Sequence, residues 1–421
     1  MQEAGRAVDA AGSRVELTAN GAARPGDAVP GDDAALPDGG AAARAASLAD
    51  VMPAAAVALG VPPWAGEPAV TLPPARIVVV LLIDGLGDVL LADRGGHAPF
   101  LRSLRTGPAL ASGFPSTTAT SMGMLGTGLP PGGHGLVGLE VLDPARGVVF
   151  NELAWDPAVD PRAWQPQPTV FERVEAAGHD VVRIGPGYFD GSGLTEATFR
   201  GGRFAAAGTL AQRVETAIAA VRAVPAGRGG LVYVYWGDLD KAGHVHGCDS
   251  WEWTQELESV DTFARRLAEG LPRDAVLAVT ADHGMVDVPF ADRLDLAVEA
   301  DLAAGVRLVG GEARALHLYC RPGAVRDVVD TWRARVGDRM AVLTRDEAVA
   351  RGWFGPVAPH VLPRIGDVVT AATGRFAVVD SRTTRPEVLA LLGLHGAGTD
   401  EERLVPLLVT AGLSRTSSPT S

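Results

Sequence analysis

Seven residues of this sequence carry the side-chain types that metal-assisted chemistry requires. They comprise three carboxylates, three imidazoles and one hydroxyl, and each follows an apolar, strand-like run or lies in a glycine-rich loop. Carboxylates and imidazoles are ligands of Zn²⁺ and similar ions, and two such ions can activate a hydroxyl and neutralise a leaving oxygen. We therefore predict a site that binds two divalent ions and contains a nucleophile. It would be formed by Asp84, Thr118, Asp240, His244, Asp282, His283 and His395.

Three of the segments are ambiguous when each is taken alone. Asp84 ends the apolar run in VVVLLIDGLGD, where an aspartate also serves as a turn or capping residue. Asp282 and His283 follow the run in VLAVTADHGM, where the two could simply hydrogen bond to each other. His395 lies among glycines in LLGLHGAG, a context that fits a surface histidine.

The segment YWGDLDKAGHVHG offers a more specific pair. Asp240 and His244 are four residues apart, which places them on one side of a helical turn and within reach of one ion. The same segment contains two alternatives. Asp238 could cap the turn, and His246 could form a hydrogen bond to a residue that binds the ion.

The segment GFPSTTATSMGMLGTG predicts a helix whose first turn carries hydroxyl groups. The N–H groups at a helix start attract anions, so Thr118 could face a bound phosphoryl group. Capping of the helix by Ser116, Thr117 or Thr118 is the alternative, and both roles can coexist.

The elements that must position these residues alternate from about residue 75 onward. Apolar strand-like runs and helix-like segments follow one another, the pattern of a mostly parallel sheet with helices on both faces. Because such sheets bind ligands beyond the carboxyl ends of their strands, Asp84, Asp240 and Asp282 should converge. We expect strands at 77–83, 109–113, 181–184, 231–236, 276–281 and 404–410, and helices at 99–105, 168–177, 210–224 and 249–271.

The sequence also predicts a division into a core, a cap and two tails. Residues 1–45, rich in Ala, Gly, Asp and Pro, and residues 414–421 are expected to be disordered. The catalytic α/β core would comprise 46–288 and 362–413. Residues 289–361 show a strand, helix, strand, helix rhythm and are expected to form a small inserted α+β cap over the site entrance.

Composition excludes several classes of protein. With 421 residues and 47% hydrophobic content, the chain can bury a large core, but its longest apolar run, 77–83, is far too short to span a bilayer. The net charge of -13 argues against binding a nucleic-acid duplex. Two cysteines and no visible secretion signal predict a cytoplasmic protein without a membrane partner.

With these segments in order, the chain resembles the alkaline phosphatase superfamily, and within it the type I phosphodiesterase/nucleotide pyrophosphatase family. The resemblance covers about residues 77–410. It rests on the Asp-Gly after the first strand, the Thr-bearing helix start followed by TGLPPGGHG, and the DKAGH, DHG and late HG segments. It implies an alkaline-phosphatase-like α/β fold and a metal-dependent phosphoester hydrolase.

The resemblance also implies roles for individual residues. One zinc would be held by Asp84, Asp282, His283 and Thr118, and the other by Asp240, His244 and His395, with Mn²⁺ as the alternative metal. Thr118 would be the nucleophile that forms a phosphothreonine, because it stands ten residues before Gly128, and Thr117 is the runner-up. Ser121 stands where the family usually has an asparagine that binds a phosphate oxygen, so Ser121 is the expected substrate-binding residue.

The expected substrate is a small phosphate ester such as a nucleotide. Within the superfamily, a phosphomonoesterase, a phosphonoacetate-type hydrolase and a phosphomutase share the same ligand arrangement. A metal-binding module without activity is the alternative from another class.

Overall fold

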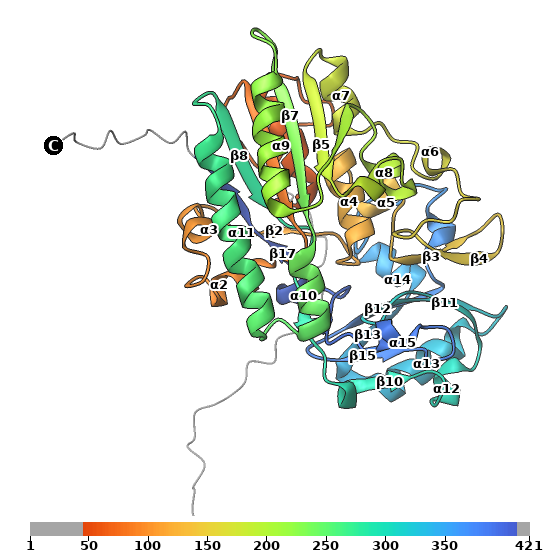
Figure 1. Ribbon diagram of the computed structural model, residues 1–421. Coiled ribbons are helices and arrows are strands. Elements are labelled where there is room, and N and C mark those ends of the chain that lie inside the picture. Colours follow the sequence, from red (N-terminus) through yellow and green to blue (C-terminus); the bar gives the residue numbers. More distant parts are fainter. Residues whose placement is uncertain (1–44, 411–421) are drawn as a thin grey trace, which may run out of the picture. The chain divides into compact units, whose positions relative to one another are not determined.

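A mostly parallel six-stranded sheet lies at the centre of the computed structural model, which describes residues 45–410 (Figure 1). β18 runs antiparallel to β8, and the other neighbouring strands are parallel. Every residue of β1 is buried, because the strand has neighbours on both sides and helices on both faces. In spatial order the strands are β18 (Leu407–Val409), β8 (Ala275–Thr280), β1 (Ile77–Ile83), β7 (Gly230–Trp236), β5 (Asp180–Gly185) and β6 (Arg203–Ala206).

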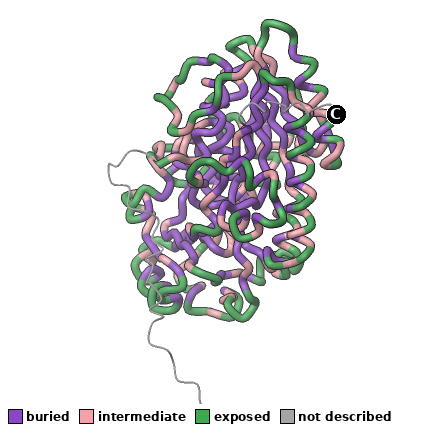
Figure 2. The backbone as a smooth tube through the Cα atoms, turned by 90° about the vertical axis from the view of Figure 1, so that its left-hand side faces the viewer, coloured by how far each residue is buried: buried purple, intermediate pink, exposed green. Residues whose placement is uncertain are grey.

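Helices cover both faces of this sheet and enclose its apolar side chains (Figures 1 and 2). Side chains fix where several of the helices begin: Thr169 and Thr209 each form a capping box with the residue three positions later. One face carries α1 (Val51–Ala58), α4 (Thr118–Thr127) and α7 (Val170–Ala176), and the other α3 (Pro99–Ser103), α9 (Leu210–Ala223) and α11 (Trp251–Gly270).

The inserted part of the chain builds a second, antiparallel sheet with its own apolar core around Trp332. Strands β10 (Arg293–Asp295) and β15 (Ala377–Val379) form a separate parallel pair. The sheet order is β11 (Val306–Glu312), β12 (Ala315–Cys320), β14 (Val368–Ala372) and β13 (Met340–Thr344), and it packs with α12 (Ala300–Ala303), α13 (Val325–Val336) and α14 (Arg345–Ala350).

Shorter elements connect these layers. They are η1 (Leu48–Asp50), α2 (Asp88–Asp93), β2 (Leu110–Ala111), α5 (Pro131–His134), β3 (Glu140–Asp143), β4 (Val148–Asn151), α6 (Pro161–Trp164), η2 (Gly187–Phe189), α8 (Gly193–Thr198), α10 (Asp238–His246), β9 (Val286–Asp287), η3 (Phe290–Asp292), η4 (Gly337–Arg339), η5 (Leu362–Arg364), α15 (Pro386–Leu389), β16 (Gly393–Leu394), α16 (Asp400–Arg403) and β17 (Leu404–Val405).

The predicted α/β fold with a mostly parallel sheet is confirmed, with local differences. Only Leu110–Ala111 of the expected strand 109–113 forms a strand, and it pairs with β17 outside the central sheet. The expected strand 404–410 is split at Pro406, which has no N–H to donate to a ladder. The sequence does not predict β6, because RFAA is short and lacks an apolar run.

The domain boundaries stay a prediction. The small sheet takes β14 from residues that the sequence assigns to the returning core, so it extends past residue 361. Residues 1–44 and 414–421 of the predicted tails lie outside the described residues. Within 45–410, no helix combines the length and the apolar character needed to cross a bilayer.

A fully buried ion pair ties the inserted part to the segment that follows His395. Arg314 donates from Nε and Nη2 to the two carboxylate oxygens of Glu402, both at 2.7 Å, and both side chains are 0% exposed. Glu402 also accepts hydrogen bonds from the Ala397 N–H and the Thr399 hydroxyl. The pair therefore fixes the loop 395–399 against two parts of the fold.

Because removal of one partner leaves the other charge buried and unpaired, Glu402→Gln should lower the free energy of unfolding by about 3 to 5 kcal/mol. Urea unfolding followed by circular dichroism measures this loss. Asp330→Asn, which removes the exposed partner of Arg326, is the matched control and should change stability by less than about 1 kcal/mol. Similar small losses for both variants would contradict the anchoring role of Glu402.

Candidate active site

Neighbouring strands deliver the predicted residues to one edge of the central sheet. Asp84 directly follows β1, Asp282 and His283 follow β8, and α10 with Asp240 follows β7. β1 lies between β7 and β8, so the three chain segments emerge side by side. The turn after β1 packs tightly on α10: a Cβ at Gly85, whose φ is +77°, would lie 2.9 Å from the Asp240 Cα.

A second pairing brings His395 to the same place. β16 pairs antiparallel with β9, so the residue that follows β16 comes beside the segment that precedes β9. The rings of His283 and His395 stack with their centroids 3.6 Å apart. The Ser116 backbone holds this loop, because its N–H donates to the Gly396 carbonyl oxygen at 3.0 Å.

The first group of donor atoms surrounds His283 Nε2. This nitrogen lies 3.4 Å from Asp84 Oδ1, 3.3 Å from Asp282 Oδ2 and 3.2 Å from Thr118 Oγ1. The Tyr235 hydroxyl donates to Asp84 Oδ2 at 2.6 Å, and the N–H groups of Gly85 and His283 donate to Asp282 Oδ1. Both carboxylates are thus oriented through one oxygen while the other oxygen faces the histidine.

The second group lies around Asp240. Its Oδ1 is 3.4 Å from His244 Nε2, and the rings of His244 and His395 lie 5.2 Å apart. One donor atom from each of Asp240, His283 and His395 lies within 4.8 Å of the other two, as do atoms of Asp84, Asp282 and His283. The two groups share His283 and are therefore adjacent.

Backbone carbonyl groups set the tautomer of all three histidines. Nδ1 donates to Gly393 O in His244 (2.7 Å), to Gly284 O in His283 (3.0 Å) and to Ser116 O in His395 (2.8 Å). A carbonyl oxygen only accepts, so Nδ1 carries the proton and Nε2 presents a lone pair. This arrangement is typical of metal-binding histidines.

Three buried carboxylate oxygens face these lone pairs. Asp84 Oδ1, Asp240 Oδ1 and Asp282 Oδ2 accept no hydrogen bond from any N–H or hydroxyl group in residues 45–410. Lone pairs that face lone pairs in a buried site repel each other unless a cation or a proton lies between them. The donor set therefore fits divalent cations.

The pKa values of the aspartates and histidines show that burial disfavours their charged forms. Burial raises the pKa of Asp240 and of Asp282 to about 7, and burial together with the Asp282 charge raises that of Asp84. Burial lowers the pKa of His283, and burial together with His283 and His244 lowers that of His395. Without a cation, Asp240 and Asp282 therefore take up protons as the pH falls toward 7, and the imidazoles of His283 and His395 remain neutral.

Thr118 is the first residue of α4, and Thr117 is its N-cap. The first N–H groups of a helix have no partner within the helix, so they point at whatever binds near Thr118. Ser121 lies one turn further on, is fully buried, and donates its hydroxyl to the Asp282 carbonyl oxygen at 2.7 Å. Its hydroxyl therefore braces the Asp282 loop and lines neither of the cavities beside Thr118.

The structure brings all seven predicted residues together. The alternatives within α10 lie elsewhere: Asp238 and His246 are exposed, and His246 Nδ1 is 3.8 Å from Glu252. Their exposure results from the helical period, which turns positions 238 and 246 away from the side shared by 240 and 244.

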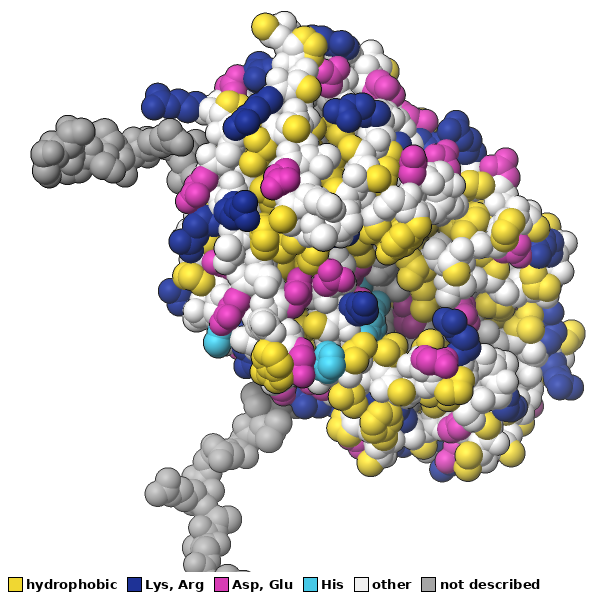
Figure 3. Space-filling model, in the orientation of Figure 1, with side chains coloured by type: hydrophobic (Ala, Val, Ile, Leu, Met, Phe, Trp, Pro, Cys, Tyr) yellow, Lys and Arg dark blue, Asp and Glu magenta, His cyan; other side chains and the backbone are white. Residues whose placement is uncertain are grey.

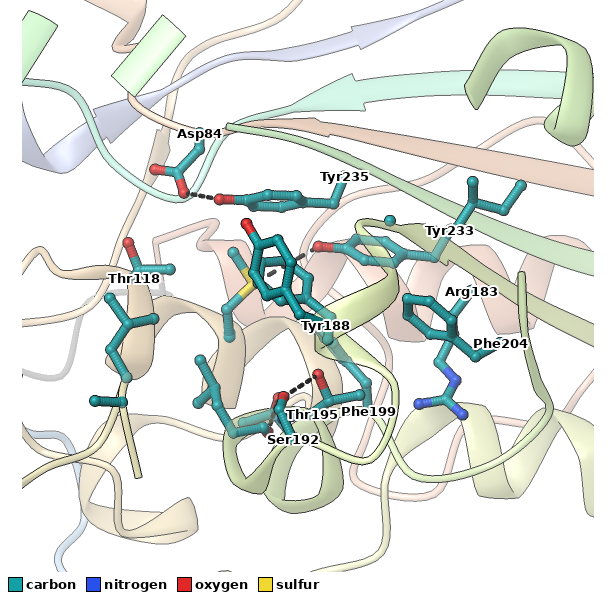
Figure 4. A pocket seen from close by; sticks show the side chains of 18 of the residues that line it. Asp84, Thr118, Arg183, Tyr188, Ser192, Thr195, Phe199, Phe204, Tyr233 and Tyr235 are labelled. Atoms are coloured by element: carbon teal, nitrogen blue, oxygen red, sulfur yellow. Dashed lines mark hydrogen bonds between the residues drawn. The ribbon is translucent and has the colours of Figure 1, made fainter. Parts of the chain in front are cut away.

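Two cavities open beside Thr118, in a face where histidine side chains are visible in a hollow (Figure 3). The first has a volume of about 500 Å³ and extends from Asp84, Thr118 and Asp240 along β5 and β7 (Figure 4). The second, of about 360 Å³, extends toward the inserted unit. Six aromatic side chains line the first cavity: Tyr188, Phe189, Phe199, Phe204, Tyr233 and Tyr235.

Sequence reasoning finds only part of this lining. From sequence, five aromatic residues could stack on a base or lie in the core: Tyr188, Phe189, Trp236, Trp251 and Trp253. Tyr188 and Phe189 line the first cavity, whereas Trp251 is exposed and Trp236 and Trp253 are buried in the core. The sequence did not reveal Tyr235 as the donor to Asp84. The alternation of Tyr233 and Tyr235 at the end of a buried strand was the available signal, because the two must face the same side.

Glu312 is a further residue that the sequence did not reveal. It lies at the end of β11, lines the second cavity, and packs against Gly396, so that a Cβ at Gly396 would lie 2.4 Å from the Glu312 Cγ. Burial raises its pKa to about 8, an effect that the Thr117 hydroxyl partly offsets. The inserted unit thus contributes a buried carboxyl group next to both Thr117 and the His395 loop.

The fold places carboxylates, imidazoles and a hydroxyl together at one edge of a mostly parallel α/β sheet. The family model of type I phosphodiesterase/nucleotide pyrophosphatase matches residues 78–397, more than half of the chain, so the chain belongs to this family. An uncharacterized pyrophosphatase/phosphodiesterase of Schizosaccharomyces pombe is 27% identical over 225 residues. That match covers 49% of this chain and 44% of the relative, so it spans less than half of the relative's length.

Solved structures show the same fold. Murine ectonucleotide pyrophosphatase/phosphodiesterase 5 matches with a TM-score of 0.63 and 19% identity, over 78% of this chain and 87% of that one. Its human counterpart matches with a TM-score of 0.62 and 18% identity, over 79% and 87% of the two chains. An inactive variant of the murine protein was solved in complex with AMP, with a TM-score of 0.63 and 18% identity over 78% and 87% of the chains.

The affinity of the metal-depleted protein for Mn²⁺ should fall as the pH falls. Asp240 and Asp282 have pKa values of about 7, so below that pH a cation must displace a proton from each, and the affinity should decrease by up to about a hundredfold per pH unit. Calorimetry in buffers of different ionisation enthalpy measures both the affinity and the protons released. Asp240→Asn should release one proton fewer near pH 6.5, and an affinity that stays constant from pH 6 to 8 would contradict the assignment.

Proposed function

We propose that this protein hydrolyses phosphodiester or pyrophosphate bonds of nucleotide-like substrates through a phosphothreonine at Thr118. The observation that carries the proposal is the position of Thr118 Oγ1. It lies 3.2 Å from His283 Nε2, at the start of a helix and at the mouth of both cavities. One hydroxyl thus sits between a cation-binding donor set and the space for a substrate.

The proposal includes two divalent ions, with zinc as the expected metal and manganese as the alternative. Asp84, Asp282, His283 and Thr118 would hold one, and Asp240, His244 and His395 the other. Ions bound there would make the hydroxyl a stronger nucleophile and neutralise charge on a leaving oxygen. The orphaned carboxylate oxygens and the fixed Nε2 lone pairs support the binding of cations by these residues.

In this proposal, residues of the chain carry out the covalent steps and hold the substrate. Thr118 Oγ gives its proton to solvent and bonds to phosphorus, while the bond to the departing oxygen breaks and that oxygen takes a proton from water. The first N–H groups of α4 hold the phosphoryl oxygens during this exchange. Water then attacks the phosphothreonine and regenerates the hydroxyl. Tyr235 and Ser121 act indirectly, because each fixes a segment that carries a carboxylate.

The first cavity favours an ester with a bulky organic group. Its volume of about 500 Å³ and its aromatic walls suit a group that remains attached to phosphorus, such as a nucleoside. In a phosphomonoesterase or a phosphonoacetate-type hydrolase, no organic group remains attached to the transferred phosphorus, so a cavity for such a group is not required. The arginine of the second cavity, Arg293, already donates to the carbonyl oxygens of Val288, Leu389 and Leu391, so it is poorly placed to serve a monoester.

Thr118→Ala should lower kcat/KM for a chromogenic diester by more than about a thousandfold, because the nucleophile is lost. Thr118→Ser should retain measurable turnover. Thermal unfolding of both variants checks that the fold is intact, and Thr117→Ala is the neighbouring control. A dead Thr117→Ala variant beside an active Thr118→Ala variant would move the nucleophile by one residue.

The metal-loaded protein should hydrolyse a nitrophenyl diester with a higher kcat/KM than nitrophenyl phosphate, by about tenfold to a hundredfold. The additional negative charge of a monoester needs a cationic partner, and residues 119–131 after the nucleophile contain no arginine or lysine. Steady-state kinetics with both esters measures the ratio. Equal or faster monoester hydrolysis would favour the phosphatase alternative, and no turnover of either ester would favour a binding module.

A further inference from the structure

One buried arginine differs from the others in how its guanidinium is satisfied. Five arginines of residues 45–410 are less than 9% exposed. In four of them, several nitrogens donate to backbone carbonyl oxygens or to a carboxylate. These four are Arg200, Arg213, Arg314 and Arg364.

Arg183, the fifth, is 7% exposed and nearly without partners. Its Nε and Nη1 make no hydrogen bond within residues 45–410, and Nη2 donates only to Gly202 O at a distance of 3.5 Å. No carboxylate of the described residues lies within 4 Å of the guanidinium, and the charges of Glu196, Asp190 and Glu175 act on it from a greater distance. Buried N–H groups without an acceptor destabilise the fold, so an arginine kept in this state indicates a ligand that completes its hydrogen bonds.

Arg183 lines the first cavity, at the end remote from the nucleophile. In Figure 4 its guanidinium lies across the cavity from Asp84 and Thr118. The strand register places Arg183 opposite Tyr233, two residues before Tyr235, whose hydroxyl reaches Asp84. Arg183 and Tyr235 are therefore separated by two residues along the strand direction and by the distance between two neighbouring strands. These spacings place their Cα atoms about 8 Å apart.

The walls between the two ends of the cavity favour a planar group. Phe199 and Tyr233 pack with ring centroids 4.8 Å apart, and the guanidinium carbon of Arg183 lies 5.9 Å from the centre of the Phe204 ring. Aromatic rings bind planar heterocycles through stacking and edge contacts. The cavity therefore combines an aromatic slot with unused N–H donors at its far end.

We propose that Arg183 is a specificity-determining residue that binds a carbonyl oxygen on a planar heterocyclic group of the substrate. A nucleobase with an exocyclic carbonyl, such as thymine, uracil or guanine, has this chemistry, and arginine is a common partner of such base edges. The inference rests on the proposed function, because the same substrate must present its phosphorus to Thr118.

The test compares two esters with the same leaving group. The p-nitrophenyl ester of thymidine 5′-monophosphate carries a base carbonyl and no second phosphate, whereas p-nitrophenyl phenylphosphonate carries a planar ring without an acceptor. Arg183→Met should lower kcat/KM for the thymidine ester by about tenfold to a hundredfold, mainly through KM, and change that for the phenylphosphonate by less than about twofold. Arg203→Met is the matched control, because Arg203 is exposed on the adjacent β6 and does not line this cavity.

Failure of the inference can be separated from failure of the proposed function. An equal loss for both esters, or no loss for the thymidine ester, would overturn the role of Arg183 while leaving phosphoester hydrolysis in place. If wild-type protein hydrolyses neither ester, the proposed function fails, and calorimetric titration with thymidine 5′-monophosphate then decides the inference. Binding to wild-type protein that is at least tenfold tighter than to Arg183→Met supports it, and equal or absent binding overturns it.

Discussion

Repulsion between buried lone pairs is the constraint on which the site depends. Three imidazoles, each fixed by a backbone carbonyl group, point Nε2 toward carboxylate oxygens that have no other donor among the described residues. Burial raises the pKa values of Asp240 and Asp282 to about 7, so protons bound near neutral pH relieve this repulsion in the metal-free protein. Divalent cations would relieve the repulsion more completely than protons, so this edge of the sheet should have an affinity for cations.

Local charge also reconciles the acidic chain with an anionic substrate. The net charge of -13 repels phosphate esters at long range, but this interaction is screened within about 10 Å in salt solution. Inside the cavity, the electrostatic potential would be dominated by three positive features. These are cations at the donor groups, the start of α4 and the guanidinium of Arg183. Substrate recognition is therefore a short-range property of the cavity.

The inserted unit and the returning chain depend on each other. Arg314 of the insert pairs with Glu402, and Glu402 in turn holds the loop that carries His395. Glu312 packs against Gly396 from the same side. His395, a predicted ligand more than a hundred residues from Asp282 in sequence, is thus fixed by a subdomain that could otherwise be taken for a separate cover of the cavity.

The sequence by itself determined the mostly parallel sheet and which residues meet at its edge. Short apolar runs such as 77–83, alternating with helix-like segments, predict strands buried on both faces, and polar residues placed directly after parallel strands come together at the carboxyl edge. Contacts distant in sequence decided the rest. The direction of each imidazole depends on a carbonyl group of another segment, the hydroxyl of Ser121 turns to Asp282, and the missing partners of Arg183 appear only once β5 lies beside β7. Residue type and spacing therefore predict which side chains can reach the carboxyl edge of the sheet. Hydrogen-bond partners and burial depend on packing between segments that are distant in sequence, and the sequence alone does not show which of these segments lie side by side.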